Sequence, residues 1–130
     1  MKALKPVIVT FLLVAMGASA SFNAQAADAK RGRVYYRMVC TVWHMEKMGG
    51  PISPSSRKRA EWASYFQTDK HDKGKDTVKQ YLSKEYRASI KAKNQAAAKY
   101  AEVPDAELME DVKAFVSAGA LDSDTPTSCD

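Results

Sequence analysis

The chain has 130 residues, of which 45% are apolar and 27% charged, and its formal net charge is +5. This length predicts one domain with a modest core, which argues against multidomain enzymes and solenoids. The composition is typical of a folded protein and excludes a fully disordered chain. The only long apolar run, Val7–Met16, has about half the length that a membrane-spanning helix needs.

The beginning of the chain is typical of a secretory signal peptide. Lys2 and Lys5 precede the apolar run, and the small-residue sequence Ala24-Gln25-Ala26 follows it. We therefore expect residues 1–26 to be a signal peptide and residues 27–130 to form one domain with no membrane span. We expect that domain to be exported, to a bacterial periplasm or outside the cell.

Helices are predicted throughout the rest of the chain, because no stretch alternates convincingly as a strand does. The first helix is expected over residues 29–42 with Asp28 as its N-cap, and its apolar stripe is formed by Val34, Met38 and Val42, with Tyr35 and Val39 beside it. Gly49-Gly50-Pro51 and Pro54 then break the chain. A second helix over 57–67, capped by Ser55 or Ser56, is expected to bury Trp62 and Phe66.

A third helix is predicted over residues 77–100, with an interruption near Ser83 and an apolar face made by Val78, Leu82, Tyr86 and Ile90. The sequence Val103-Pro104-Asp105 stops it and begins a fourth helix over 106–118. That helix ends at Gly119 and directs Leu108, Val112, Phe115 and Val116 inward. Residues 120–130 are predicted to be an irregular tail.

Charge is distributed unevenly along the sequence. Residues 30–99 carry 17 Lys and Arg against 6 Asp and Glu, whereas residues 100–130 carry 1 against 8. Two interpretations are open: a solvated helical surface, or a basic face that steers an acidic partner. Nucleic acid is disfavoured as a partner, because no basic motif is interleaved with aromatic residues.

The stretch with the most chemical information is Cys40-Thr41-Val42-Trp43-His44. In an exported chain, Cys-x-x-Cys-His indicates covalent haem attachment: two thiols add to the haem vinyl groups and the adjacent imidazole reaches the iron. Here Trp43 stands where the second thiol is required. The motif is therefore broken at one of its three defining residues.

Other residues strengthen this signal. Gly32 lies eight residues before Cys40, Tyr36 lies four before it, and the last predicted helix contains Asp-Val-Lys-Ala-Phe-Val at 111–116. With these features the chain resembles the class I c-type cytochromes, in particular the bacterial single-haem periplasmic ones, over residues 28–119. The resemblance implies an all-α fold, a small helical bundle whose first and last helices cross at Gly32.

The resemblance also implies site residues and a function. Cys40 would anchor haem c through a single thioether, with Trp43 beside it, and His44 would be the proximal iron ligand. The carbonyl of Pro51 or Pro54 would orient the imidazole. A distal methionine has no counterpart, since residues 91–105 contain none. The remaining candidates for the sixth ligand are Met45, Met48, Met109 and, as the best of them, His71. The implied function is one-electron transfer by a monomer that meets redox partner proteins transiently, without enzyme activity.

Two further interpretations stay open. The first is a haem-free relative with a binding or structural role, stapled by a Cys40–Cys129 disulfide, in which aromatic side chains replace the haem: Trp62, Tyr65, Phe66, Tyr81 and Tyr86. The second is a periplasmic Cu(I)-binding protein that uses Cys40, His44, Met45 and Met48. In addition, His44 could be an ordinary partly buried histidine, and His71 a solvated loop residue.

Overall fold

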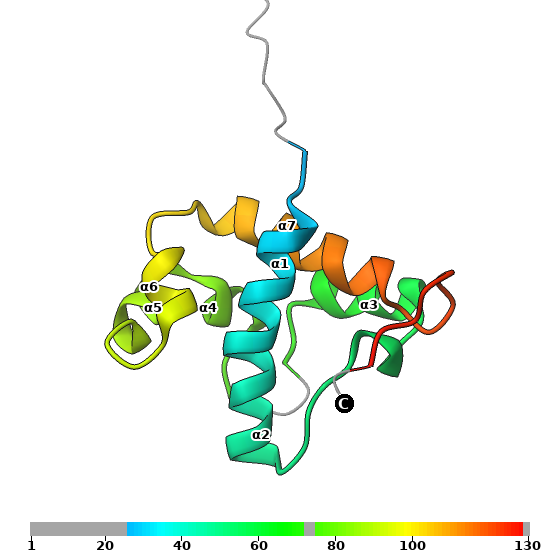
Figure 1. The fold of residues 1–130 in the computed structure, drawn as a ribbon, viewed down its shortest axis with the longest axis horizontal. Helices are drawn as coiled ribbons and strands as arrows, with labels where there is room; N and C mark the ends of the chain where they lie inside the picture. The colour runs from blue at the N-terminus through cyan, green and yellow to red at the C-terminus, as the bar shows by residue number, and fades with distance from the viewer. Residues whose placement is uncertain (1–25, 72–74, 129–130) are drawn as a thin grey trace, which may run out of the picture.

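The computed structural model describes residues 26–71 and 75–128, and in these two ranges the chain forms helices, turns and loops without a strand (Figure 1). The all-α prediction is therefore confirmed. None of the helices in these ranges is long and apolar enough to cross a membrane. Nearly all of the predicted signal peptide, and also Cys129, lie outside the described residues.

One long helix opens the fold. It consists of α1 (Ala29–Tyr35), the π-helical segment η1 (Tyr36–Thr41) and α2 (Val42–Met48), which follow one another without a break (Figure 1). Asp28 caps it as predicted, because its side chain accepts hydrogen bonds from the backbone N–H groups of Lys30 and Arg31, each at 3.0 Å. The helix continues well beyond Val42, the residue at which the sequence predicted its end.

The predicted apolar stripe of this helix is wrong. Val34, Met38 and Val42 are exposed, by 37%, 43% and 40%. The side chains beside that stripe are the buried ones: Tyr35, Tyr36 and Val39. They lie three, four and seven residues after Gly32, on the face of the helix that Gly32 places against α7, the helix Asp105–Ala118. Close backbone approach at one glycine thus decides which of two adjacent apolar stripes is buried.

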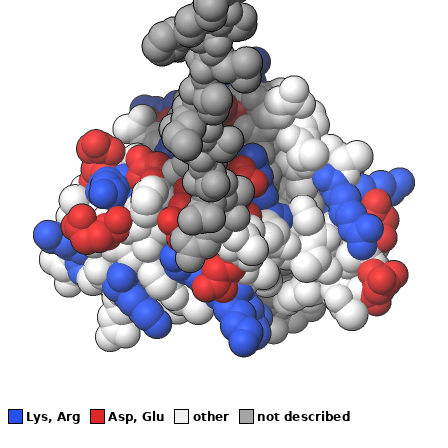
Figure 2. Space-filling model, turned by 90° about the horizontal axis from the view of Figure 1, so that it is seen from above, with Lys and Arg blue, Asp and Glu red and all other residues white. Residues whose placement is uncertain are grey.

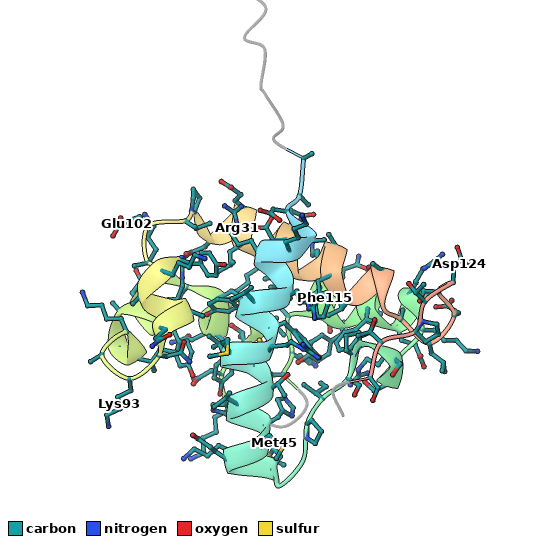
Figure 3. The ribbon with its side chains drawn as sticks, viewed as in Figure 1. Arg31, Met45, Lys93, Glu102, Phe115 and Asp124 are labelled. Carbon is teal, nitrogen blue, oxygen red and sulfur yellow. The ribbon has the colours of Figure 1, made fainter. Side chains whose placement is uncertain are left out.

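The helix α7 (Asp105–Ala118) lies against α1 (Figures 1 and 3). A Cβ atom on Gly32 would lie 2.0 Å from the carbonyl oxygen of Asp111, so only glycine fits there. The buried carboxylate of Asp111 accepts a hydrogen bond from the backbone N–H of Asp28 at 2.6 Å and another from Arg31 Nε at 2.5 Å. Arg31 also pairs with Glu107. These hydrogen bonds raise the pKa of Arg31 above its usual value, so its charge is permanent.

The remaining elements pack around this pair. They are η2 (Pro54–Ser56), α3 (Arg59–Thr68), α4 (Val78–Leu82), α5 (Lys84–Ile90) and α6 (Gln95–Lys99). Trp62 and Phe66 on α3 are buried as predicted, but the helix begins after Lys58, where Glu61 accepts from the Lys58 N–H at 2.7 Å. Neither Ser55 nor Ser56 caps it, because both belong to η2.

The predicted third helix is three short ones. The interruption at Ser83 is confirmed: its side chain accepts from the backbone N–H of Tyr86 and so begins α5. A second interruption at residues 91–94 was missed, and there Asn94 begins α6 by accepting from Ala97. The fourth helix agrees with its prediction, since Leu108, Val112, Phe115 and Val116 are buried and Gly119 follows its last turn.

The basic and acidic parts of the sequence pair with each other in the fold. Besides the contacts of Arg31, Lys84 lies 3.7 Å from Glu102, and the fully buried Arg87 pairs with Asp105 at 2.5 Å. Figure 2 accordingly shows Lys and Arg side chains interspersed with Asp and Glu on the face it presents. Three basic residues of the region 30–99, namely Arg31, Lys84 and Arg87, are thus paired with acidic residues of the region 100–130 in the described structure.

Candidate functional site

A small cavity lies between η1, α2, α3, α4 and the segment at His71, with a volume of about 40 Å³. We call it the aromatic cavity. No Asp, Glu, Lys or Arg is among the described residues that line it. They are Tyr36, Val39, Cys40, Trp43, His44, Ile52, Trp62, Tyr65, Phe66, His71, Val78, Tyr81, Leu82, Tyr86 and Val112. The five aromatic residues that the sequence proposed as replacements for haem all lie in this wall.

The long helix places three of the predicted site residues in the cavity wall. Cys40 belongs to η1, and Trp43 and His44 belong to the first turn of α2. His44 is only 7% exposed. His44 follows Cys40 by four positions, which puts both on one side of the helix. His44 and Cys40 thus both lie in the wall of the same cavity.

The π-helical turn that carries Cys40 is held from outside the helix. The carbonyl oxygen of Met38 accepts a hydrogen bond from Asn94 Nδ2 at 2.7 Å, and the side-chain oxygen of Asn94 caps α6. Asn94 thus connects α6 to the wall of the cavity. Single π turns are frequent at functional sites, because they redirect side chains within a helix. Sequence reasoning missed this residue, although an Asn directly before Gln95-Ala96-Ala97 is a recognisable N-cap signal.

His71 lies against His44. The two imidazole ring centroids are 5.5 Å apart, with an angle of 61° between the planes. The indole of Trp43 contacts both rings, at 5.3 Å from His44 and 5.1 Å from His71. The ring of Tyr81 lies 4.8 Å from that of His71 and 5.4 Å from that of Trp43. The structure therefore brings together His44 and His71, the two histidines of the chain, and packs Trp43 against them.

These residues do not fit haem in this arrangement. A porphyrin plane would have to separate His44 from His71, yet the two imidazoles are in contact. The cavity volume of about 40 Å³ is room for one or two water-sized groups. Pockets that hold drug-sized ligands measure roughly 300–1,000 Å³. The side chain that replaces the second attachment thiol, Trp43, is also one of those that fill the space.

Cys40 is a free thiol in the structure, so the proposed disulfide is not formed there, and Cys129 lies outside the described residues. Burial raises the pKa of the Cys40 thiol to about 12. At neutral pH the thiol is therefore protonated. A protonated thiol is a weak nucleophile and a weak metal ligand.

The other predicted site residues lie elsewhere. Pro51 is exposed, and the carbonyl of Pro54 accepts a hydrogen bond from the indole N–H of Trp62 at 2.8 Å. Met45 and Met48 are 51% and 45% exposed, and Figure 3 shows Met45 on α2, at the opposite end of the long helix from Arg31. Met109 lines a separate groove beside α4. None of the three candidate methionines lines the aromatic cavity.

A second cavity of about 270 Å³ adjoins the first. His44, Ile52 and Tyr65 line both, and the remaining residues of the second are Met48, Gly50, Pro51 and Arg57. We call it the outer cavity. The guanidinium of Arg57 lies over the rings of Trp62 and Tyr65, at 5.5 and 5.0 Å from their centroids. His44 is thus a wall residue shared by the two spaces.

The resemblance to class I cytochromes depends on Gly32, Tyr36, the Cys40–His44 motif and residues 111–116. Within the described ranges, no group of three or more His, Cys, Asp or Glu side chains is arranged to hold a metal ion. Comparison with protein-family models, with curated proteins and with solved structures finds no match for the chain.

Proposed function

We propose that the chain is an exported, haem-free protein with a cytochrome c-like fold, whose aromatic cavity binds a ligand much smaller than a porphyrin. The contact between His44 and His71 inside a cavity of about 40 Å³ carries this proposal. The sequence supports it independently, because Trp43 removes one of the two attachment thiols. A cytochrome that had lost its haem would be expected to lack both an attachment thiol and the space for a porphyrin.

The cytochrome-like fold, with crossing terminal helices, is part of the proposal. Its support is the contact of Gly32 with the backbone of Asp111, together with the ring of Tyr36 packed 5.5 Å from that of Phe115. All four belong to the positions through which the sequence resembles the family. Export to the periplasm, a monomeric state and transient protein partners stay predictions from the sequence.

The cavity is suited to binding rather than to catalysis. Its described walls offer two imidazoles and one protonated thiol among apolar and aromatic groups. The alternative hypothesis, one-electron transfer through a single haem held by Cys40 and His44, requires His71 and Trp43 to move away from His44. Electron transfer through haem stays a prediction. The haemin titration described next decides between it and the haem-free proposal.

The test is a titration of the purified protein with haemin, followed by its Soret absorbance. We expect no saturable binding by the wild type and saturable binding by Trp43→Gly, because the glycine opens the space that the indole fills. Met45→Gly is the matched control: it introduces a glycine into the same helix at an exposed position and should leave the cavity closed. Tight haemin binding by the wild type would contradict the proposal.

A second arm uses covalent attachment. Trp43→Cys restores the two-thiol motif and at the same time removes the indole. Expressed with the cytochrome c maturation machinery, this variant should carry haem that resists acid–acetone extraction, whereas the wild type should be colourless. If Trp43→Cys stays colourless, the cavity is not a former haem site filled by Trp43, and the proposed relation to cytochromes is wrong.

A further inference from the structure

We propose that the aromatic cavity binds one small, uncharged and apolar molecule, of the size of a diatomic gas. The inference rests on the proposed function, since it requires a cavity that haem does not occupy, and it names the class of ligand that such a cavity takes. The volume of the cavity, the apolar surface of its wall and the absence of charged residues among those described in it each exclude a different class of competing ligand.

The volume of the aromatic cavity limits the size of its ligand. About 40 Å³ is room for roughly one or two water-sized groups, which a diatomic molecule fills. The aromatic side chains of the wall are in contact with one another: the ring centroids of Tyr36 and Trp62 are 6.3 Å apart, and those of Tyr81 and Tyr86 are 5.1 Å apart. A ligand with a ring or a longer chain would have to displace several of these side chains.

The surface of the wall disfavours polar ligands and water. Cys40, His44 and four tyrosines are among the lining residues, yet the surface presented to the cavity is almost entirely apolar. A buried polar ligand without a hydrogen bond is costly, and a buried water molecule needs about two to four polar partners. Burial also raises the pKa of the Cys40 thiol to about 12, as expected beside a space that holds little water.

The absence of charge disfavours ions. No Asp, Glu, Lys or Arg is among the described residues that line the aromatic cavity, and burying an ion without an opposite charge is costly. An apolar molecule loses no hydrogen bond when it leaves water, and it gains dispersion contacts with the surrounding rings. The outer cavity differs, because its volume is about 270 Å³ and Arg57 lines it. We therefore place the gas-sized ligand in the aromatic cavity.

Xenon is the probe, because it is uncharged, apolar and similar in size to a diatomic gas. It is dissolved under pressure in a solution of the full chain, and the methyl resonances are followed by nuclear magnetic resonance. We expect saturable shifts for Val39, Leu82 and Val112, which line the cavity, and little change for Leu108 and Val116, which are fully buried but do not line it. A ligand of so few atoms binds weakly, with a dissociation constant of about a millimolar or more.

Two matched substitutions test where xenon binds. Val39→Leu adds a methylene group to the wall of a cavity that is scarcely larger, so the affinity for xenon should fall by about tenfold or more. Val34→Leu makes the same change on the same helix at a position that is 37% exposed, and should bind xenon as the wild type does. A thermal melt checks that each variant folds. Leu82→Ala tests the cavity in the opposite direction: it enlarges the space and should allow benzene to bind.

Three results would overturn the inference. They are an absence of saturable shifts at Val39, Leu82 and Val112, equal effects of the two valine substitutions, and a shift confined to Met48, which lines the outer cavity and not the aromatic one. If the wild type binds haemin, the proposed function itself fails. If it does not bind haemin and one of the three xenon results is obtained, only the inference about the ligand fails.

Discussion

The contact between α1 and α7 and the aromatic cavity are built by opposite means. At the first, backbone lies against backbone at Gly32, and the buried carboxylate of Asp111 is satisfied by Arg31 and by the Asp28 N–H. At the second, aromatic and imidazole rings meet mostly at steep angles around leftover space, on a helix that widens into a π turn. We therefore expect the contact between α1 and α7 to accept only one arrangement of side chains, and the aromatic cavity to accept several.

The scaffold and the site therefore differ in how well they tolerate substitution. At the contact between α1 and α7, replacing the glycine would disrupt close packing, and replacing a member of the buried ion pair would leave a charge unpaired. The rings around the aromatic cavity have unfilled space beside them, so we expect substitutions there to cost less than substitutions at the contact between α1 and α7.

The largest loss of stability is expected for Gly32→Ala. The new Cβ would lie 2.0 Å from the Asp111 carbonyl oxygen, which is backbone and cannot move aside. The free energy of unfolding should fall by more than about 3 kcal/mol, the upper end of the usual cost of overpacking, because the clash is with backbone rather than with a side chain. Chemical denaturation measures it, with Gly50→Ala as a control because a Cβ there meets nothing within 4 Å. Equal effects at the two glycines would refute the close contact.

The next largest effect is expected for Asp111→Asn. This change leaves Arg31 with only Glu107 and weakens the hydrogen bond from the Asp28 N–H. Breaking a buried pair costs about 3–5 kcal/mol, and because Arg31 is partly exposed we expect about 3 kcal/mol. Glu110→Gln on the same helix, whose pair with Lys113 is exposed, should change stability by less than about 1 kcal/mol. The account would be wrong if the two substitutions cost the same.

Asn94→Ala should cost about 1–2 kcal/mol and should also disturb the cavity. It removes the cap of α6 and the hydrogen bond to the Met38 carbonyl in the π turn. Gln95→Ala, at the exposed neighbouring position, is the control. The readouts are unfolding by denaturant and the amide hydrogen exchange of residues 36–41. If exchange in the π turn does not change, Asn94 does not support it.

The Cys40 thiol predicts a dependence on alkaline pH. Its pKa is about 12 in the folded chain and about 8.5 when unfolded, so between these values the unfolded chain releases a proton that the folded chain retains. Stability therefore falls as pH rises through this window, and Cys40→Ala should make the fall shallower. Melting temperatures between about pH 7 and 10 test this. A slope that the substitution leaves unchanged would contradict the burial of the thiol.

The smallest effect is expected for His71→Phe, which should change stability by less than about 1 kcal/mol, because one ring replaces another against Trp43 and Tyr81. The difference between the stability losses of His71→Phe and Asp111→Asn compares the two regions most directly. A loss as large as that of Asp111→Asn would show that the cavity is as constrained as the α1–α7 contact.

The sequence predicts the helices of this fold better than their faces. Caps and breakers act locally, which is why Asp28, Ser83 and Gly119 were placed correctly. The buried face of the first helix was not, because Gly32 matters there only through its contact with Asp111, which is distant in the sequence. At the site, Cys40, His44 and His71, which the haem motif and the resemblance proposed as cofactor-binding residues, all line one cavity. Neither the π turn nor the ring contact between the histidines follows from spacing, because each involves residues that are distant in the sequence: Asn94 bonds to the π turn, and His71 packs against Trp43 and His44.

The most direct test is the ultraviolet–visible spectrum of the full chain, expressed in a bacterium that carries the cytochrome c maturation machinery and purified without denaturation. Our account predicts a colourless protein, with the absorbance of its aromatic residues and no Soret band. A Soret band that stays with the chain after acid–acetone extraction would contradict it, and would make the protein a cytochrome anchored at Cys40.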